Sequence, residues 1–314
     1  MFFGFGTQAQ FLDSLIIGGL KSYENGNYTQ AITYYDSAIV KYPNLPYLYV
    51  IKAEAIFNSG YAGGEKLPIT DPAVYAEAIQ LLDKALEISP SSADTHASRG
   101  LLNTIHQKYE LAVQDFSNVL LNSFDFDKMF NALSDRASAY SRMQQYEKAL
   151  TDYSNAIELK PDDLSAWVNM SVVYNEQGQT AKAEEVLQEV LAKDDTYTPA
   201  LNNLGLIKAK QEKYQEANEL LQKALIIDSR DAVTLNNYGF SLGMSGKVEQ
   251  GMSLINQSLK LYQSNAFAYR NIGLIYLKQG DKKIACENFN KAKELYFKAS
   301  YGEEVNELIE ANCK

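Results

Sequence analysis

The dominant feature of the sequence is an internal repeat of 34 residues. Four segments align without gaps, each 34 residues after the one before, and start at Ala166, Ala200, Thr234 and Ala268. The same frame accepts QQYEKALTDYSNAIELKP, which ends at Pro161, and GNYTQAITYYDSAIVKYP, which ends at Pro43. A fixed period of this length is typical of an array in which each unit buries its apolar face against its neighbours.

Eight units account for residues 12–299 and leave only 1–11 and 300–314 outside the array. The second unit is longer than the others because it contains an insertion, GYAGGEKLPITDP, which starts at Gly60. We interpret the insertion as a surface loop, either a binding loop or a tolerated one. No segment is left for a separate catalytic domain. The predicted units are 12–45, 46–92, 93–129, 130–163, 164–197, 198–231, 232–265 and 266–299.

Each unit has the pattern of two helices. In the fifth unit apolar residues recur at three- and four-residue steps, the period of one helix face, at Trp167, Met170, Tyr174, Ala183, Leu187 and Val190. Glycines that can end the first helix lie at Gly26, Gly60, Gly178, Gly246 and Gly280. Small residues recur where the two helices would cross, at Gly19, Gly100, Gly205, Gly239 and Gly273, and at Ala31, Ala78, Ala112, Ala149, Ala183, Ala217 and Ala285. Large residues follow these alanines by four positions, at Tyr35, Phe116, Tyr153, Leu221 and Phe289.

This pattern resembles the tetratricopeptide repeat. The eighth unit keeps the residues of that family at Tyr269, Gly273, Tyr276, Ala285, Phe289 and Ala292. The seventh unit departs from it with Gly251, where the family prefers Ala. The resemblance implies an all-α fold, a right-handed α-solenoid superhelix of helical hairpins. Val305, Leu308 and Ile309 share one helical face, so residues 300–314 are predicted to form a capping helix.

Composition and the lack of known motifs exclude several classes of function. The net charge of -10 does not suit an unaided nucleic-acid-binding protein, because such a protein needs cations against phosphates. Two Cys and two His are too few for a zinc-built fold, and no catalytic or phosphate-binding motif is present. His96 takes a position where other units carry Leu or Tyr, so we expect a packed imidazole. We therefore expect no enzyme, no cofactor, no metal and no membrane span.

The resemblance also implies protein or peptide recognition in a concave groove lined by the first helix of each unit. One position on that helix carries Asn in four consecutive units, at Asn169, Asn203, Asn237 and Asn271, and Asp135 takes the same position one unit earlier. Apolar residues follow three positions later, at Val172, Leu206, Phe240 and Leu274. Asn202, Asn236 and Arg270 precede three of these Asn residues and complete the predicted peptide-binding groove.

An Asn side chain can grip an extended peptide because its carbonyl accepts from a backbone N–H while its amide N–H donates to a backbone C=O. The row is similar to the asparagine ladder in the superhelix of O-linked GlcNAc transferase. The alternative is that these Asn residues merely link neighbouring repeats. Terminal-carboxylate clamps also occur in the family, but Arg270, Lys210 and Lys278 do not reproduce their residue set.

The sequence therefore favours a non-enzymatic scaffold or adaptor that binds an extended segment of a partner protein. The alternative function is a specific inhibitor of the immunity type, which neutralises a toxin through a broad acidic surface. Self-association through the end repeats is left open.

The two ends of the chain leave two further alternatives. Residues 1–11 are either a short apolar arm or the end of a signal peptide. In the first case we expect the chain as written to be cytoplasmic, and in the second case we expect it to be periplasmic or exported. Cys286 and Cys313 lie on helices that would pack side by side, so they form either a disulfide that locks the cap or two free buried thiols.

Overall fold

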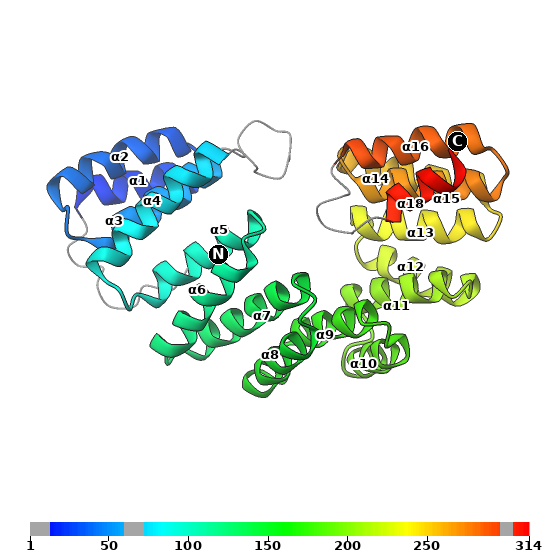
Figure 1. Cartoon of the computed structure of the whole chain (residues 1–314), viewed down its shortest axis with the longest axis horizontal. Helices are drawn as coiled ribbons and strands as arrows, with labels where there is room; N and C mark the ends of the chain where they lie inside the picture. The colour runs from blue at the N-terminus through cyan, green and yellow to red at the C-terminus, as the bar shows by residue number, and fades with distance from the viewer. Residues whose placement is uncertain (1–12, 60–71, 296–303, 314) are drawn as a thin grey trace. The chain divides into compact units, whose positions relative to one another are not determined.

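The computed structural model of the chain describes residues 13–59, 72–295 and 304–313. In these residues every regular element is an α-helix, and the helices follow one another as hairpins (Figure 1). The predicted arm at 1–11 and the insertion from Gly60 lie outside the described residues, apart from its last residue, Pro72, which begins α4. The chain divides into two compact units, one ending at Leu159 and the other beginning at Lys160.

The first compact unit contains four hairpins. Its helices are α1 (Ser14–Glu24), α2 (Tyr28–Lys41), α3 (Pro46–Ser59), α4 (Pro72–Ile88), α5 (Ala93–Ile105), α6 (Tyr109–Asn122), α7 (Phe126–Arg142) and α8 (Tyr146–Leu159).

The second compact unit contains four hairpins and a terminal helix. Its helices are α9 (Leu164–Glu176), α10 (Thr180–Lys193), α11 (Thr198–Lys210), α12 (Tyr214–Ile227), α13 (Ala232–Met244), α14 (Val248–Leu261), α15 (Ala266–Lys278), α16 (Lys282–Glu294) and α18 (Glu304–Asn312).

The helices of a hairpin pack through the small and large residues that repeat in the sequence. A β-carbon added at Gly19 would come within 2.3 Å of the Tyr35 ring, and one added at Gly273 would come within 2.4 Å of the Phe289 ring. Tyr35 and Phe289 are themselves fully buried. Each large side chain contributes about 1.5–3 kcal/mol by leaving water, and it can do so only because its partner helix carries no side chain at the point of contact.

The turn between the two helices of a hairpin needs one residue in the left-handed region. Glycine occupies it at Gly26, Gly178, Gly246 and Gly280, with φ between 75° and 95°. Where the sequence has no glycine, Gln107, Gln144 and Glu212 take the same conformation, with φ between 57° and 60°. The turn geometry is therefore kept even where the residue is unfavourable for it.

The fourth hairpin begins earlier than the repeat frame indicates. The frame places the start of this unit at Phe130, whereas α7 begins at Phe126. Asp125 causes the early start because its carboxylate accepts from the backbone N–H groups of Asp127 and Lys128, at 2.9 and 3.1 Å, and so caps the helix.

The terminal helix α18 covers the last hairpin. Val305, in its first turn, is buried against Ala285, Phe289 and Ala292 of α16. A disulfide joins Cys286 in α16 to Cys313, the residue after the end of α18, with 5.6 Å between their Cα atoms. The last hairpin is thus covered by packing at one end of α18 and by a covalent bond at the other.

Candidate functional site

The predicted groove residues of the second unit lie on its first helices, α9, α11, α13 and α15. We call the surface that they form the first-helix face. Each of these helices begins five residues before its Asn, so Asn169, Asn203, Asn237 and Asn271 take equivalent positions. Asp135 takes the equivalent position of the repeat frame in α7, in the first unit.

The four Asn side chains differ in exposure. Asn169 is exposed and Asn203 is half-buried, whereas Asn237 and Asn271 are 6% and 3% exposed. The two buried amides donate to the preceding hairpin: Asn237 Nδ2 lies 3.0 Å from Asn202 Oδ1, and Asn271 Nδ2 lies 3.3 Å from Asn236 Oδ1. These two side chains therefore link successive hairpins, while Asn169 and Asn203 keep access to solvent.

The apolar positions of the first-helix face do not follow the same order along the chain. Val172 is 39% exposed, Leu206 and Leu274 are half-buried, and Phe240 is only 6% exposed. Phe240 belongs to an apolar cluster with Ile272 and Ile275 of α15, and α13 packs closely against α15, since a β-carbon on Gly243 would come within 2.4 Å of Ile275 Cδ1. The accessible amides and the most exposed apolar side chain of this face therefore lie on α9 and α11.

The cations of the first-helix face differ in their contacts. Arg270 donates from Nη1 to Asn271 Oδ1 at 2.8 Å and from Nη2 to Glu304 of α18, and its Nε is buried without an acceptor. Lys210, two hairpins earlier, interacts electrostatically with both Arg270 and Glu304. Lys278 is engaged elsewhere, because its Nζ donates to the Met244 carbonyl at 2.8 Å.

Asp135 belongs to the first unit and is not on the helices of this face. Burial raises its pKa from 3.8 to about 6, and none of the described residues forms a hydrogen bond or an ion pair with it. Burial also raises the pKa of Glu54 in α3, although Ser98 Oγ donates to that carboxylate at 3.2 Å.

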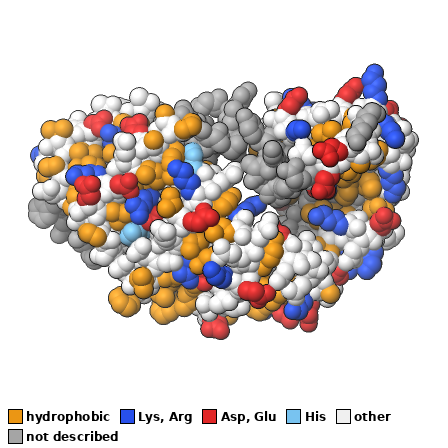
Figure 2. Space-filling view, in the orientation of Figure 1, with side chains coloured by type: hydrophobic (Ala, Val, Ile, Leu, Met, Phe, Trp, Pro, Cys, Tyr) orange, Lys and Arg blue, Asp and Glu red, His pale blue; other side chains and the backbone are white. Residues whose placement is uncertain are grey.

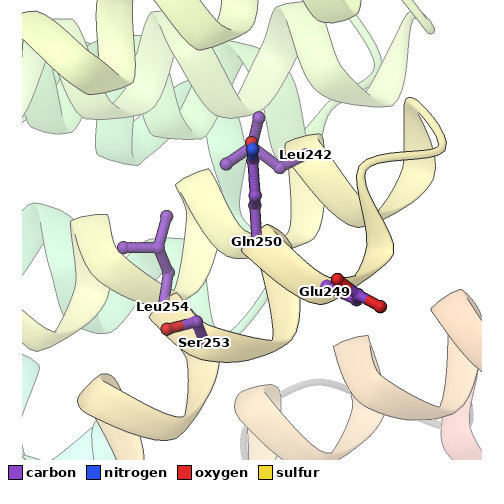
Figure 3. Close-up of a pocket in the computed structure, with 5 residues that line it drawn as sticks. All are labelled: Leu242, Glu249, Gln250, Ser253 and Leu254. Carbon is purple, nitrogen blue, oxygen red and sulfur yellow. The ribbon is translucent and has the colours of Figure 1, made fainter.

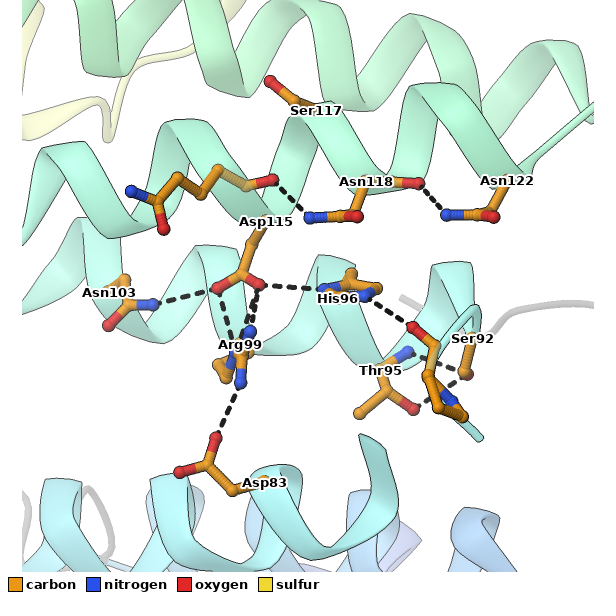
Figure 4. A network of polar contacts seen from close by, with 12 residues as sticks. Asp83, Ser92, Thr95, His96, Arg99, Asn103, Asp115, Ser117, Asn118 and Asn122 are labelled. Carbon is orange, nitrogen blue, oxygen red and sulfur yellow. Dashed lines mark hydrogen bonds and ion pairs between the residues drawn. The ribbon is translucent and has the colours of Figure 1, made fainter. Parts of the chain in front are cut away.

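His96 belongs to a buried polar network that sequence reasoning missed (Figure 4). Its Nδ1 lies 2.9 Å from Asp115 Oδ1 and its Nε2 lies 3.0 Å from the Pro90 carbonyl oxygen. Arg99 Nη2 and Asn103 Nδ2 also donate to Asp115, at 2.7 and 3.0 Å. Both ring nitrogens of His96 are occupied, and the residue is 6% exposed. The geometry is that of a packed imidazole with a structural role, as expected.

A second pair of Arg and Asp, in the next hairpin, repeats the contact of Arg99 with Asp115. Arg136 Nε donates to Asp152 Oδ2 at 2.7 Å, and Asp152 follows Arg136 by 16 residues, as Asp115 follows Arg99. Both pairs join the first helix of a hairpin to the second. The repeated spacing of 16 residues was the signal in the sequence that could have predicted them.

A depression on the second unit lies elsewhere (Figure 3). It has a volume of about 430 Å³ and is lined by Leu242 of α13 and by Glu249, Gln250, Ser253 and Leu254 of α14. None of the predicted groove residues lines it.

Within 13–59, 72–295 and 304–313, no three His, Cys, Asp or Glu side chains are placed to hold a metal ion. The longest helices in these ranges, α4 and α7, have 17 residues, and none of the described helices has the length and apolarity to cross a bilayer.

Comparison with protein families identifies the repeat. Models described as "Tetratricopeptide repeat" match residues 141–204, 200–227, 268–298 and 21–45. The chain is a tetratricopeptide repeat protein. Its all-α fold and its helical repeats are confirmed, whereas the likeness of the Asn row to that of O-linked GlcNAc transferase stays a prediction.

Two curated relatives match over part of the chain. Tetratricopeptide repeat-containing protein trd-1 of Caenorhabditis elegans is 30% identical over 115 residues, which are 36% of this chain and 14% of that protein. Anaphase-promoting complex subunit 7 of Mus musculus is 29% identical over 117 residues, which are 37% of this chain and 20% of that protein. The chain thus matches less than a quarter of the length of either relative.

A solved structure extends the likeness in fold. The crystal structure of yeast Tom70 aligns with 98% of this chain and 66% of its own chain, with a TM-score of 0.67 and 17% identity. At this identity the likeness concerns the fold alone.

Proposed function

We propose that the protein is a non-enzymatic interaction scaffold that binds an extended segment of a partner protein on the first-helix face of its second unit. The tetratricopeptide fold and the similarity to a subunit of the anaphase-promoting complex, a protein assembly by its name, support the scaffold role. The observation that carries the peptide-binding role is the pairing of accessible amides with accessible apolar side chains on α9 and α11.

The chemistry of this surface suits a main chain in an extended conformation. Asn169 and Asn203 have no hydrogen-bond partner among the described residues, so each can accept from a backbone N–H and donate to a backbone C=O. Val172 and Leu206 lie three positions after these amides and provide apolar contacts for alternate side chains. Asn237 and Asn271 support the surface by fixing the neighbouring hairpins to one another.

The one face drawn in Figure 2 gives the alternative of a broad acidic surface no support. On the face of the molecule drawn in Figure 2, acidic and basic side chains are interspersed among hydrophobic ones. We therefore take the peptide-binding scaffold as the function that the structure supports best.

An array of immobilised dodecapeptides tests the proposal. The peptides are acetylated and amidated at their ends and are made in matched pairs, one carrying Glu where the other carries Gln. We expect the protein to bind a subset, and the double variant Asn169→Ala, Asn203→Ala to bind that subset at least about tenfold more weakly.

The control variant is Asn256→Ala, at an exposed position of α14, which is the second helix of its hairpin. This variant should bind the peptides as the unaltered protein does. Equal binding by the double variant and the control would exclude the first-helix face as the binding surface. Absence of binding to every peptide would count against peptide recognition itself.

A further inference from the structure

A cation–π contact joins the two helices of a hairpin at the same repeat positions in two consecutive hairpins. Lys148 Nζ of α8 lies 5.3 Å from the centre of the Tyr140 ring of α7. In the next hairpin, Lys182 Nζ of α10 lies 5.4 Å from the centre of the Tyr174 ring of α9. In both hairpins the Lys follows the Tyr by eight residues. The Tyr ring therefore fills the space between the first helix and this point of the second helix.

The following two hairpins carry other residues at these positions. In α11 and α12 they are Lys208 and Glu216, whose Nζ and Oε2 atoms are 3.6 Å apart, so a polar contact is kept. In α13 and α14 they are Leu242 and Gln250, and a leucine can form neither an ion pair nor a cation–π contact. These two residues both line the depression of about 430 Å³ (Figure 3). The depression thus lies at the repeat position where two other hairpins place a Tyr ring.

The lining of the depression suits a flat ring with a polar edge. Leu242 is buried and Leu254 is half-buried, so both provide apolar surface. Gln250 and Ser253 are exposed and provide hydrogen-bonding groups. Gln250 and Leu254 project from the same side of α14, whereas Glu249 points away from them (Figure 3). A Tyr side chain has the matching character, because its ring is apolar and its hydroxyl both donates and accepts.

A buried acceptor on the preceding helix lacks a donor. Glu184 of α10 accepts from Lys208 Nζ of α11 at 2.6 Å. Asn218 of α12 and Leu242 of α13 take the positions of this pair in the next repeat. Asn218 Oδ1 is buried and has no hydrogen-bond partner among the described residues. The leucine therefore leaves this hairpin with a depression and the preceding helix with an unused acceptor, which is a costly state for a buried polar atom.

We propose that the depression between α13 and α14 binds the side chain of a Tyr from a partner protein, which takes in this hairpin the place that Tyr140 and Tyr174 take in theirs. A Lys side chain suits the site less well, because the two carboxylates that Lys208 meets in its own hairpin pair are replaced by Asn218 and Gln250. The inference goes beyond the proposed function, because the site lies on other helices than the accessible amides of α9 and α11.

Amide NMR spectra of the isotope-labelled full chain test the site. The probes are N-acetyl-tyrosinamide, its Phe and Lys analogues, and a capped peptide that carries one Tyr among glycines. We expect both Tyr probes to shift the signals of Leu242, Gln250 and Leu254 saturably, with a Kd on the order of 1 mM. The Phe analogue should bind several-fold more weakly because it lacks the hydroxyl, and the Lys analogue should bind more weakly still.

Two variants fill the depression from within the chain. Leu242→Tyr should weaken binding of the Tyr probes at least about tenfold and should unfold at a temperature no lower than that of the unaltered protein. Ser253→Leu, at an exposed position of the lining, should also weaken binding, and it keeps the test valid if Leu242→Tyr does not fold. The control Asn256→Ala, at an exposed position of α14 outside the lining, should bind as the unaltered protein does.

The outcomes are independent of the peptide array, because these probes report on α13 and α14. Absence of saturable shifts with the Tyr probes would overturn the site and leave the proposed function standing. Unchanged binding by Leu242→Tyr and Ser253→Leu would show that the probes bind elsewhere, which would also overturn it. If the Phe or Lys analogue binds as tightly as N-acetyl-tyrosinamide, the assignment to Tyr is wrong. If the amide binds but the capped peptide does not, the site takes a small molecule and the assignment to a partner protein is wrong.

Discussion

Gly251 of α14 lies against the backbone of Gly239 of α13 so closely that a β-carbon at position 251 would come within 2.4 Å of the Gly239 carbonyl oxygen. Other repeats have alanine here, such as Ala217 and Ala285, both fully buried. Glycine is less favourable than alanine inside a helix, but here it permits a closer approach of the two helices than alanine would.

We therefore predict that Gly251→Ala destabilises the protein by about 1–3 kcal/mol, the usual cost of overpacking. The methyl group would meet backbone atoms of Gly239 and Gly243, which cannot rotate away. Urea unfolding measures the effect. The control Ser253→Ala, at an exposed position of the same helix, should change stability by less than about 0.5 kcal/mol. A Gly251→Ala protein as stable as the control would contradict the close approach.

Gln144 occupies a turn position that four other hairpins give to glycine. Its φ of 57° lies in the left-handed region, which is unfavourable for a residue with a β-carbon. We predict that Gln144→Gly raises the free energy of unfolding by about 0.5–1 kcal/mol, because relief of strain exceeds the added entropy of the unfolded chain. The reverse change at an equivalent turn, Gly178→Gln, should lower it. Thermal unfolding measures both variants. A stability change of opposite sign in the two would confirm that both turn positions require the left-handed conformation, and a change of the same sign would contradict it.

The buried carboxyl group of Asp135 predicts a dependence of stability on pH. Its pKa in the folded protein, about 6, lies above the ordinary value of 3.8, so the folded state favours the protonated form. Ionisation therefore lowers stability as pH rises from about 4 to about 6, and the loss is complete above that range. Asp135→Asn should be more stable than the unaltered protein at pH 7, by about 1–2 kcal/mol after allowance for partial exposure, and should match it near pH 4.

Urea unfolding across this pH range checks the prediction. The control Asp162→Asn replaces an exposed carboxylate and should leave the pH profile in place. A constant difference between Asp135→Asn and the unaltered protein at every pH would show that Asp135 ionises in the folded state as it does in the unfolded chain.

Asp115 holds three side chains of the first unit in place. Replacement by Ala leaves Arg99, Asn103 and His96 without their shared acceptor, and removal of one partner from a buried ion pair costs about 3–5 kcal/mol. We predict a loss of at least about 3 kcal/mol for Asp115→Ala. The exposed pair of Lys84 and Glu87 serves as a control, since Glu87→Ala should cost less than about 1 kcal/mol. Similar losses in both variants would argue against a structural role for the buried network.

The helical repeats could be predicted from the sequence because residue size alternates with a fixed period. Gly19 opposite Tyr35 and Gly273 opposite Phe289 obey the same rule in hairpins far apart in the chain. The start of α7 could not be predicted from that period, because the local capping by Asp125 decides where this helix begins.

Other features depended on information that a repeat pattern does not contain. Asn169 and Asn271 are the same residue at the same position, yet one is exposed, whereas the other is buried and donates to Asn236 of α13. The burial of Asp115 was missed because acidic residues are normally solvated, and only the contacts of α6 with side chains of α5 show that this one is not.

Because of the bond between Cys286 and Cys313, the structure of the C-terminal end depends on the redox conditions of a preparation. If the thiols are reduced, α18 depends on the packing of Val305 and its neighbours alone, and the last hairpin can lose its cover. Samples grown or stored with reductant would then expose Phe289 and its surroundings, which would favour aggregation, and their binding data would describe a different C-terminal end.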